Sequence, residues 1–197
     1  MFYAVYRSVR NNSWQCLLDF ELTRLPIDLL QITRRAGIRV IRNSLVHDLL
    51  PGENGKAYCE GSQWTILYDD TNSTELSRFT IAHELGHIFL GHELRHAKFA
   101  GVQEFAEKPV SEKHANAFAT RLLCPACILW GLDLHTADEI ARYCRVESEI
   151  AEARAKRMKT LYKRDLFLTD PLEELLYQNF REYINETALG LSSGEKL

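Results

Sequence analysis

Two histidines four residues apart, with a glutamate beside the first, form the part of the sequence best suited to chemistry. His83 and His87 would lie one turn apart on a helix, so that both imidazoles point the same way and can bind one zinc ion. Glu84 would lie where its carboxylate can take a proton from a water molecule attacking a peptide carbonyl. The spacing predicts a hydrolytic metal site with His83 and His87 as ligands and Glu84 as the general base.

A catalytic zinc ion needs a third protein ligand. We favour Glu112, because Asn116 follows one helical turn later and its amide carbonyl could accept the ring N–H of a ligating histidine. Small residues at Ala115 and Ala119 would let this helix approach its neighbour closely. His114 is the alternative third ligand, since imidazole binds zinc well, but it points about 200° around the helix from Glu112. The two side chains cannot serve the same ion.

The residues after His87 exclude one class of zinc peptidase. Metzincins carry a glycine three residues and a histidine six residues after the second histidine of the motif. Leu90 and Glu93 occupy those positions. His92 lies close to the end of the same predicted helix, and we expect it to be a cap or a surface residue rather than a ligand.

Two helices must position these groups. The first is predicted to be capped within Asn72-Ser73-Thr74-Glu75 and to end at Gly91. Ser111 is predicted to cap the second, which would end at Pro125, and the polar stretch at residues 92–110 between them is expected to be mobile. The apolar residues of the first helix recur at spacings of three and four, which indicates one buried face: Phe79, Ile81, Ala82, Leu85, Ile88 and Phe89.

A small antiparallel sheet is predicted before these helices, which gives an α+β fold with the sheet packed on the active-site helix. Strands are expected at residues 38–41, 56–59 and 63–68, the last two joined in a hairpin. The edge of the strand at residues 63–68 could hold an extended substrate. Further upstream, Ser13 is predicted to cap a short helix, and Pro26 to open a second helix that ends at Gly37.

The motifs together resemble the ImmA/IrrE-type metallo-endopeptidases, over about residues 25–158. The segments that carry the resemblance are His83-Glu-Leu-Gly-His87, Gly91-His92, Glu112-Lys-His-Ala-Asn116-Ala-Phe-Ala119 and Leu122-Leu-Cys-Pro125. Members are typically cytosolic zinc-dependent proteins, often encoded with phages or integrative elements, that cleave or antagonise helix-turn-helix repressors. The resemblance implies a zincin-like peptidase in which His83, His87 and Glu112 bind zinc and Glu84 is the general base. The sequence departs from the family at His114, where an acidic residue is common.

The last third of the sequence predicts a helical C-terminal part. Asp170 is expected to cap the final helix. We expect a zincin-like core at residues 1–132, a helical subdomain at 133–187 that packs on it, and a disordered tail at 188–197. The helices are predicted at residues 126–130, 137–143, 148–161 and 171–184.

Residues 136–157 offer an alternative function, because they resemble a helix-turn-helix and are locally basic. The chain could be a DNA-binding regulator, with zinc as a structural or sensing ion. It could also be a module that binds repressors without cutting them. The basic residues are Arg142, Arg145, Arg154, Lys156, Arg157 and Lys159.

The overall composition excludes several classes of protein. With 24 Lys and Arg against 27 Asp and Glu in 197 residues, the formal net charge is −3, so no global basic field points to nucleic acid. Two arginines interrupt the first ten residues, and the apolar run at 122–132 is too short to span a bilayer. Five cysteines favour reduced thiols, and Cys124 and Cys127 are expected to be ordinary buried thiols. We therefore expect a cytoplasmic protein with a protein substrate and no membrane partner.

Overall fold

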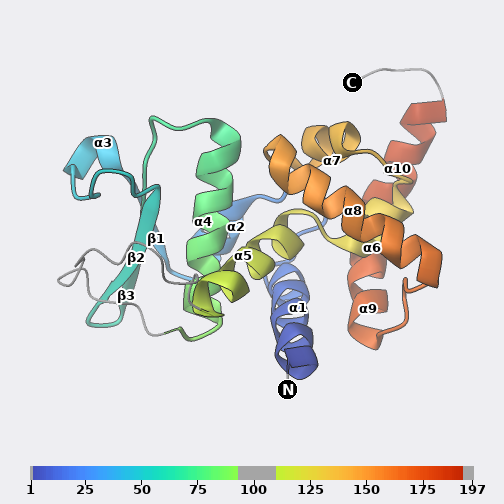
Figure 1. Cartoon of the computed structure of the whole chain (residues 1–197), viewed down its shortest axis with the longest axis horizontal. Coiled ribbons are helices and arrows are strands. Elements are labelled where there is room, and N and C mark those ends of the chain that lie inside the picture. The colour runs from blue at the N-terminus through green and yellow to red at the C-terminus, as the bar shows by residue number, and fades with distance from the viewer. Residues whose placement is uncertain (1, 93–109, 193–197) are drawn as a thin grey trace. The chain divides into compact units, whose positions relative to one another are not determined.

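The computed structural model describes residues 2–92 and 110–192 (Figure 1). Contacts divide the chain into two compact units, Met1–Asn12 with Leu29–Ala119 and Ser13–Asp28 with Thr120–Leu197. Helices α1 (Phe2–Asp19) and α5 (Val110–Leu123) each contribute to both units. Within the described ranges, none of the helices has the length and apolar character that crossing a bilayer requires.

The first unit packs helices on a small sheet, which confirms the predicted α+β fold (Figure 1). Helix α4 packs against β2 and β3, while α2 contacts β1 and α4. Besides parts of α1 and α5, the elements are α2 (Leu29–Arg35), β1 (Arg39–Arg42), α3 (Asn43–Val46), β2 (Gly55–Glu60), β3 (Gln63–Tyr68) and α4 (Thr74–Phe89).

The three strands lie in the order β1-β3-β2 and form a mixed sheet. β2 and β3 form the predicted antiparallel hairpin, but β1 pairs with β3 in parallel, so the expectation of a wholly antiparallel sheet is wrong for β1. The cause is the connection through α3, which carries the chain past the position that β3 later fills. β3 is therefore the central strand, and its backbone is paired on both sides. The predicted substrate-binding edge at residues 63–68 is wrong for the same reason.

Helix α4 begins and ends where the sequence predicts. The Ser73 hydroxyl accepts a hydrogen bond from the backbone N–H of Leu76 at 3.1 Å, which caps the first turn. The helix stops at Gly91, whose φ of +65° lies in the left-handed region that glycine adopts without strain. These local signals fix the register of the helix that carries His83, Glu84 and His87.

Helix α1 differs from its prediction. It runs from Phe2 to Asp19, so Ser13 lies inside it and is fully buried instead of capping its start. Serine and asparagine usually interrupt helices by competing for the backbone, but here Asn12 Nδ2 donates to Ser8 Oγ at 3.4 Å, which satisfies two such side chains on the helix surface. Pro26 likewise precedes its helix, since α2 begins at Leu29.

The start of α5 also differs from its prediction. The helix already includes Val110, so Ser111 lies in its first turn and is not the cap. Most of the stretch predicted to be mobile, residues 93–109, lies outside the described residues.

The second unit is helical. Asp170 caps α9 as predicted, since its side chain accepts from the N–H of Leu172. The single helix predicted at 171–184 is wrong: it is interrupted at Phe180, which is fully buried, and Asn179 Nδ2 donates to the carbonyl of Leu22 at 2.8 Å, a contact that no local pattern reveals. Residues 188–192, predicted as tail, continue α10. The helices are α6 (Ala126–Gly131), α7 (Ala137–Cys144), α8 (Ser148–Arg164), α9 (Pro171–Asn179) and α10 (Arg181–Ser192).

The cysteines contribute mainly to the core. All five are free thiols, and four of them are buried. Burial raises the pKa of the Cys127 thiol, so that the nucleophilic thiolate is disfavoured. Cys124 and Cys127 are therefore the ordinary buried thiols that the sequence predicts.

Candidate metal centre

Three predicted ligand side chains meet in the first unit. His83 and His87 come from α4, with their Nε2 atoms 3.0 Å apart. Glu112, from the first turn of α5, places one carboxylate oxygen 3.2 Å from His83 Nε2 and the other 3.2 Å from His87 Nε2. In the described part of the chain, this is the group of three side chains whose donor atoms converge closely enough to hold a metal ion.

The donor set and its spacing fit zinc. Zinc is bound in proteins by imidazole nitrogen and carboxylate oxygen at about 2.0 to 2.2 Å, and two ligands of a tetrahedral ion are then about 3.3 Å apart. The separations of 3.0 and 3.2 Å between the donor atoms are close to that value. Three protein ligands also leave one position for a water molecule or substrate, which is the pattern of catalytic sites.

Asn116 orients the first histidine. Its carbonyl oxygen Oδ1 lies 2.9 Å from His83 Nδ1. Because a carbonyl oxygen only accepts hydrogen bonds, the ring proton must be on Nδ1, which leaves the lone pair of Nε2 directed at the cluster. This contact was predicted from the spacing of Glu112 and Asn116.

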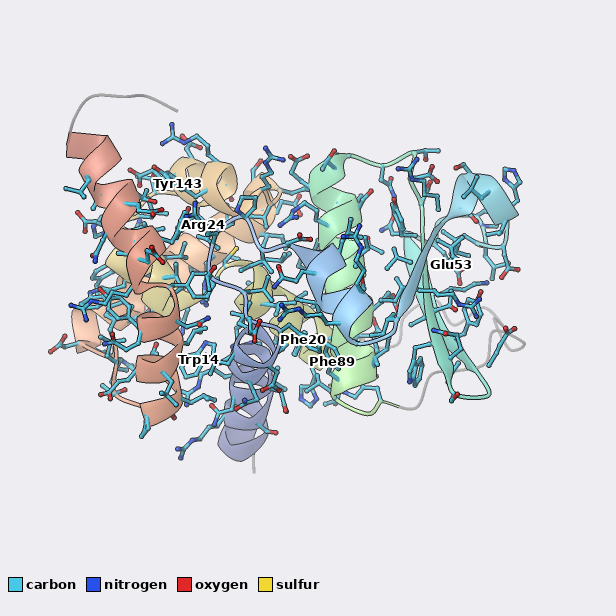
Figure 2. The ribbon with its side chains drawn as sticks, turned by 180° about the vertical axis from the view of Figure 1, so that it is seen from behind. Trp14, Phe20, Arg24, Glu53, Phe89 and Tyr143 are labelled. Atoms are coloured by element: carbon cyan, nitrogen blue, oxygen red, sulfur yellow. The ribbon has the colours of Figure 1, made fainter. Side chains whose placement is uncertain are left out.

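A glycine on α4 allows α5 to come close enough to supply Glu112. A Cβ atom at Gly86 would lie 3.1 Å from Ala115 Cα and 3.2 Å from both the Ala115 carbonyl oxygen and Phe118 Cδ1. Near the same contact, the ring of Phe89, at the end of α4 (Figure 2), lies 6.2 Å from that of Phe118. The absence of a side chain at position 86 therefore sets the distance between the two helices.

Glu84 lies beside the cluster in a buried environment, with 8% of its surface exposed. Burial raises the pKa of its carboxyl group to about 7, and the charges of Glu112 and Glu53 add to the rise. A hydrogen bond from the backbone N–H of Ala57 in β2 opposes it. At neutral pH the carboxylate can thus both take up and release a proton, as a general acid–base group must.

A second glycine brings β2 to this carboxylate. A Cβ atom at Gly55 would collide with Thr80 Cγ2 on α4 and would lie 2.8 Å from the carbonyl oxygen of Leu67. The strand can approach α4 this closely because residue 55 has no side chain. The close approach puts the N–H of Ala57 within reach of Glu84.

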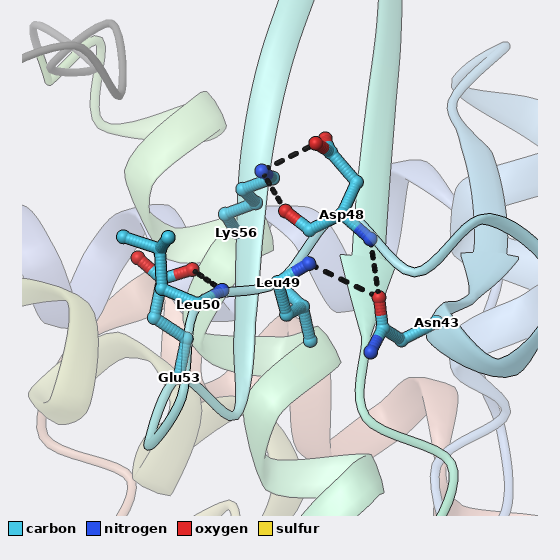
Figure 3. A network of polar contacts seen from close by, with 6 residues as sticks. All are labelled: Asn43, Asp48, Leu49, Leu50, Glu53 and Lys56. Carbon is cyan, nitrogen blue, oxygen red and sulfur yellow. Dashed lines mark hydrogen bonds and ion pairs between the residues drawn. The ribbon is translucent and has the colours of Figure 1, made fainter.

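Polar contacts fix the loop that leads into β2 (Figure 3). Asn43 Oδ1 accepts from the backbone N–H of Asp48 at 2.9 Å, and Glu53 Oε2 accepts from that of Leu50 at 2.9 Å. Lys56 Nζ forms an ion pair with Asp48 Oδ2 at 2.9 Å. These polar contacts therefore hold the start of β2, the strand beside Glu84, in a fixed position.

His87 is suited to metal binding near neutral pH. Burial, followed by the nearby His83, lowers its pKa to about 4, and the charge of Glu112 opposes this only in part. The imidazole is therefore neutral at pH 7. A neutral imidazole is the form that binds a metal ion.

Two further histidines, His92 and His114, lie near the site. His114 lies outside the cluster, with its ring 6.0 Å from that of His92. His92, expected as a cap or surface residue, does cap the end of α4 through its backbone N–H, and its Nδ1 also lies 3.2 Å from Nδ1 of His87. Sequence reasoning missed this contact, as it missed Gly86 and Ala57; the glycine before His92, which turns the chain back, was the available signal.

A family model matches most of the first unit's sequence. The model of the family described as Peptidase_M78, IrrE N-terminal-like domain, matches residues 33–156. The search of curated proteins found no match. The matched segment contains the whole cluster.

Gly86→Ala should weaken zinc binding. The added methyl group would push α5 away and separate Glu112 from the histidines, so we expect the zinc dissociation constant to rise by at least about tenfold, measured by competition with a chromophoric chelator. Gly131→Ala is the matched control, because its Cβ would crowd Tyr177 Cε2 at 2.7 Å in the second unit. That control should lose stability and keep its zinc affinity; equal affinities in both variants would contradict the prediction.

In the metal-free protein, ionisation of Glu84 should lower the free energy of unfolding as the pH rises. The folded pKa of about 7 exceeds the ordinary value of 4.5. This stabilising contribution is therefore complete below about pH 4.5 and disappears as the pH rises through about 7. Glu84→Gln abolishes this titration. Between about pH 5 and pH 8, the free energy of unfolding of the variant minus that of the parent should therefore increase by on the order of 2 to 3 kcal/mol. Urea denaturation after chelation measures this, and a constant difference would refute it.

Proposed function

The chain belongs to the Peptidase_M78, IrrE N-terminal-like, family and is a metallopeptidase, and from this premise we propose that it is a zinc-dependent endopeptidase that hydrolyses a specific cytoplasmic protein. The observation that carries the proposal is the convergence of His83, His87 and Glu112 beside the buried carboxylate of Glu84. In this proposal the first three side chains bind zinc and Glu84 is the general base.

The chain's own groups supply the proton transfers. The Glu84 carboxylate takes a proton from the attacking water and later delivers it to the nitrogen of the departing amine. The N–H of Ala57 holds that carboxylate in place. Asn116 keeps the ring proton of His83 on Nδ1. Zinc, when bound, polarises the peptide carbonyl and makes water a better nucleophile at neutral pH.

The edge of β2 that faces away from β3 is suited to hold an extended substrate. Among the described strands, β2 pairs only with β3. The N–H of Ala57 points away from β3, because it donates to Glu84. Alternate residues of an antiparallel strand share this direction, so Gly55 and Cys59 present their backbone groups on the same edge. A peptide paired with this edge would pass directly by the general base.

The resemblance to ImmA/IrrE-type proteins favours one class of substrate, a helix-turn-helix repressor of a phage or mobile element. In this proposal the protein acts in transcription regulation through proteolysis. The substrate class rests on the family, whereas the chemistry rests on the site.

The DNA-binding alternative has observations for and against it, and those against it weigh more. α7 and α8 are separated by three residues, as in a helix-turn-helix, and Arg142 and Arg145 are exposed. However, Arg154 is only 7% exposed and cannot contact phosphates. The start of α8, where such a motif reads bases, carries Glu147 and Glu149, whose charges repel DNA.

Glu84→Gln should retain zinc and lose turnover. We expect cleavage of purified helix-turn-helix repressors by the zinc-loaded parent, and a rate at least about a hundredfold lower in the variant, because its amide cannot take up the proton. Mass spectrometry of the products gives the rate and the cleavage site. Equal rates in parent and variant would rule out Glu84 as the base, and intact repressors with the parent would favour the non-cleaving module.

Glu112→Ala should remove metal, and His114→Ala should not. We expect about one zinc ion per chain in the parent and in His114→Ala after dialysis, and a large loss in Glu112→Ala, because two imidazoles alone complete only half of a tetrahedral site. Elemental analysis of the purified proteins measures the content. Zinc lost with His114 alone would show that our choice of third ligand is wrong.

A further inference from the structure

The end of α4 is a Schellman motif that involves a proposed zinc ligand. Gly91 has a φ of +65°, its N–H donates to the carbonyl of Ile88 at 3.2 Å, and the N–H of His92 donates to the carbonyl of His87 at 3.0 Å. This pair of backbone bonds is the signature of the motif. It commonly brings together the side chain that follows the glycine and the side chain of the last helical turn, usually as an apolar contact.

In this chain the two side chains that meet are imidazoles. The rings of His87 and His92 lie edge to face, with centroids 5.0 Å apart and planes at 74°. Nδ1 of one is 3.2 Å from Nδ1 of the other, within hydrogen-bond distance. The helix-ending motif therefore places a polar partner on the side of His87 that faces away from the cluster.

The positions of the protons follow from the geometry. His87 Nε2 faces His83 Nε2 at 3.0 Å and Glu112 Oε1 at 3.2 Å, so its lone pair must be free if it is to bind zinc. The proton of neutral His87 is then on Nδ1. His92 can accept that proton's hydrogen bond only if its own proton is on Nε2.

We propose that His92 is a positioning residue of the metal centre, which accepts a hydrogen bond from His87 Nδ1–H and thereby fixes the ring orientation and tautomer of His87. It does for His87 what Asn116 does for His83, at 3.2 Å and 2.9 Å respectively. The inference rests on the proposed zinc site and adds a residue that the ligand set does not include. Partners of this kind are worth about 10- to 100-fold in metal affinity.

The decisive variants are His92→Leu and His92→Asn. Leucine removes the acceptor, whereas the carbonyl oxygen of asparagine can occupy about the position of Nδ1 and restore it. His114→Leu is the matched control, because its ring lies 6.0 Å from that of His92 on the side of α5 and outside the cluster. Zinc affinity is measured by competition with a chromophoric chelator, and ligand geometry by the visible spectrum of the Co²⁺-loaded chain.

We expect the zinc dissociation constant to rise about 10- to 100-fold in His92→Leu, to recover in His92→Asn, and to change by less than about twofold in His114→Leu. The Co²⁺ spectrum should change only in His92→Leu. Parent-like affinity in His92→Leu would overturn the inference, as would a His92→Asn variant as weak as His92→Leu. A parent that binds no zinc would instead overturn the proposed function, so the two failures are distinguishable.

A measurement on the parent covers the case in which the variants fold poorly. Long-range proton–nitrogen NMR of the zinc-loaded parent near pH 7.5 reports which ring nitrogens carry protons. We expect a proton on Nδ1 of His87 and on Nε2, but not Nδ1, of His92. A proton on His92 Nδ1 would overturn the inference, because that nitrogen could not then accept.

Discussion

The candidate metal centre depends on the contact between α4 and α5 at Gly86. One helix can present two imidazoles one turn apart, but it cannot place a third ligand on the same ion, so a second backbone must come within van der Waals distance. A glycine facing Ala115 permits this, with only 3.1 Å between the missing Cβ and the Ala115 Cα atom. The same contact determines where Glu112 and Asn116 lie along the axis of α4, because both residues are within one helical turn of Ala115.

The site is supported from three directions by groups that need not touch an ion or substrate. Asn116 comes from α5, the N–H of Ala57 from the sheet, and His92 from the turn that ends α4. Each restrains a different reactive side chain. Such restraint lowers the cost of organising the site during the reaction. The loop before β2, fixed by Asn43 and Glu53, extends this order to the edge of the sheet.

Much of the site could be predicted because its rules are local. The one-turn spacing of His83 and His87, the cap at Ser73 and the stop at Gly91 depend on neighbouring residues only. Strand partners, in contrast, depend on the path of the whole chain, which is why the parallel pairing of β1 escaped prediction. The interruption at Phe180 escaped for the same reason, since it coincides with a contact to a residue more than 150 positions away. The choice of Glu112 over His114, in contrast, could be made from the sequence, because the spacing of Glu112 and Asn116 on one helix is local.

The buried carboxylate of Glu84 affects how stable the protein is with and without a bound metal ion. The charge of Glu112 lies close enough to disfavour the charged form of Glu84. A bound dication would offset that repulsion in the folded chain only, because the unfolded chain has no such cluster. Folding and metal uptake are then thermodynamically linked. The supply of the bound metal would therefore set not only how much of the peptidase is active but also how long each copy resists degradation.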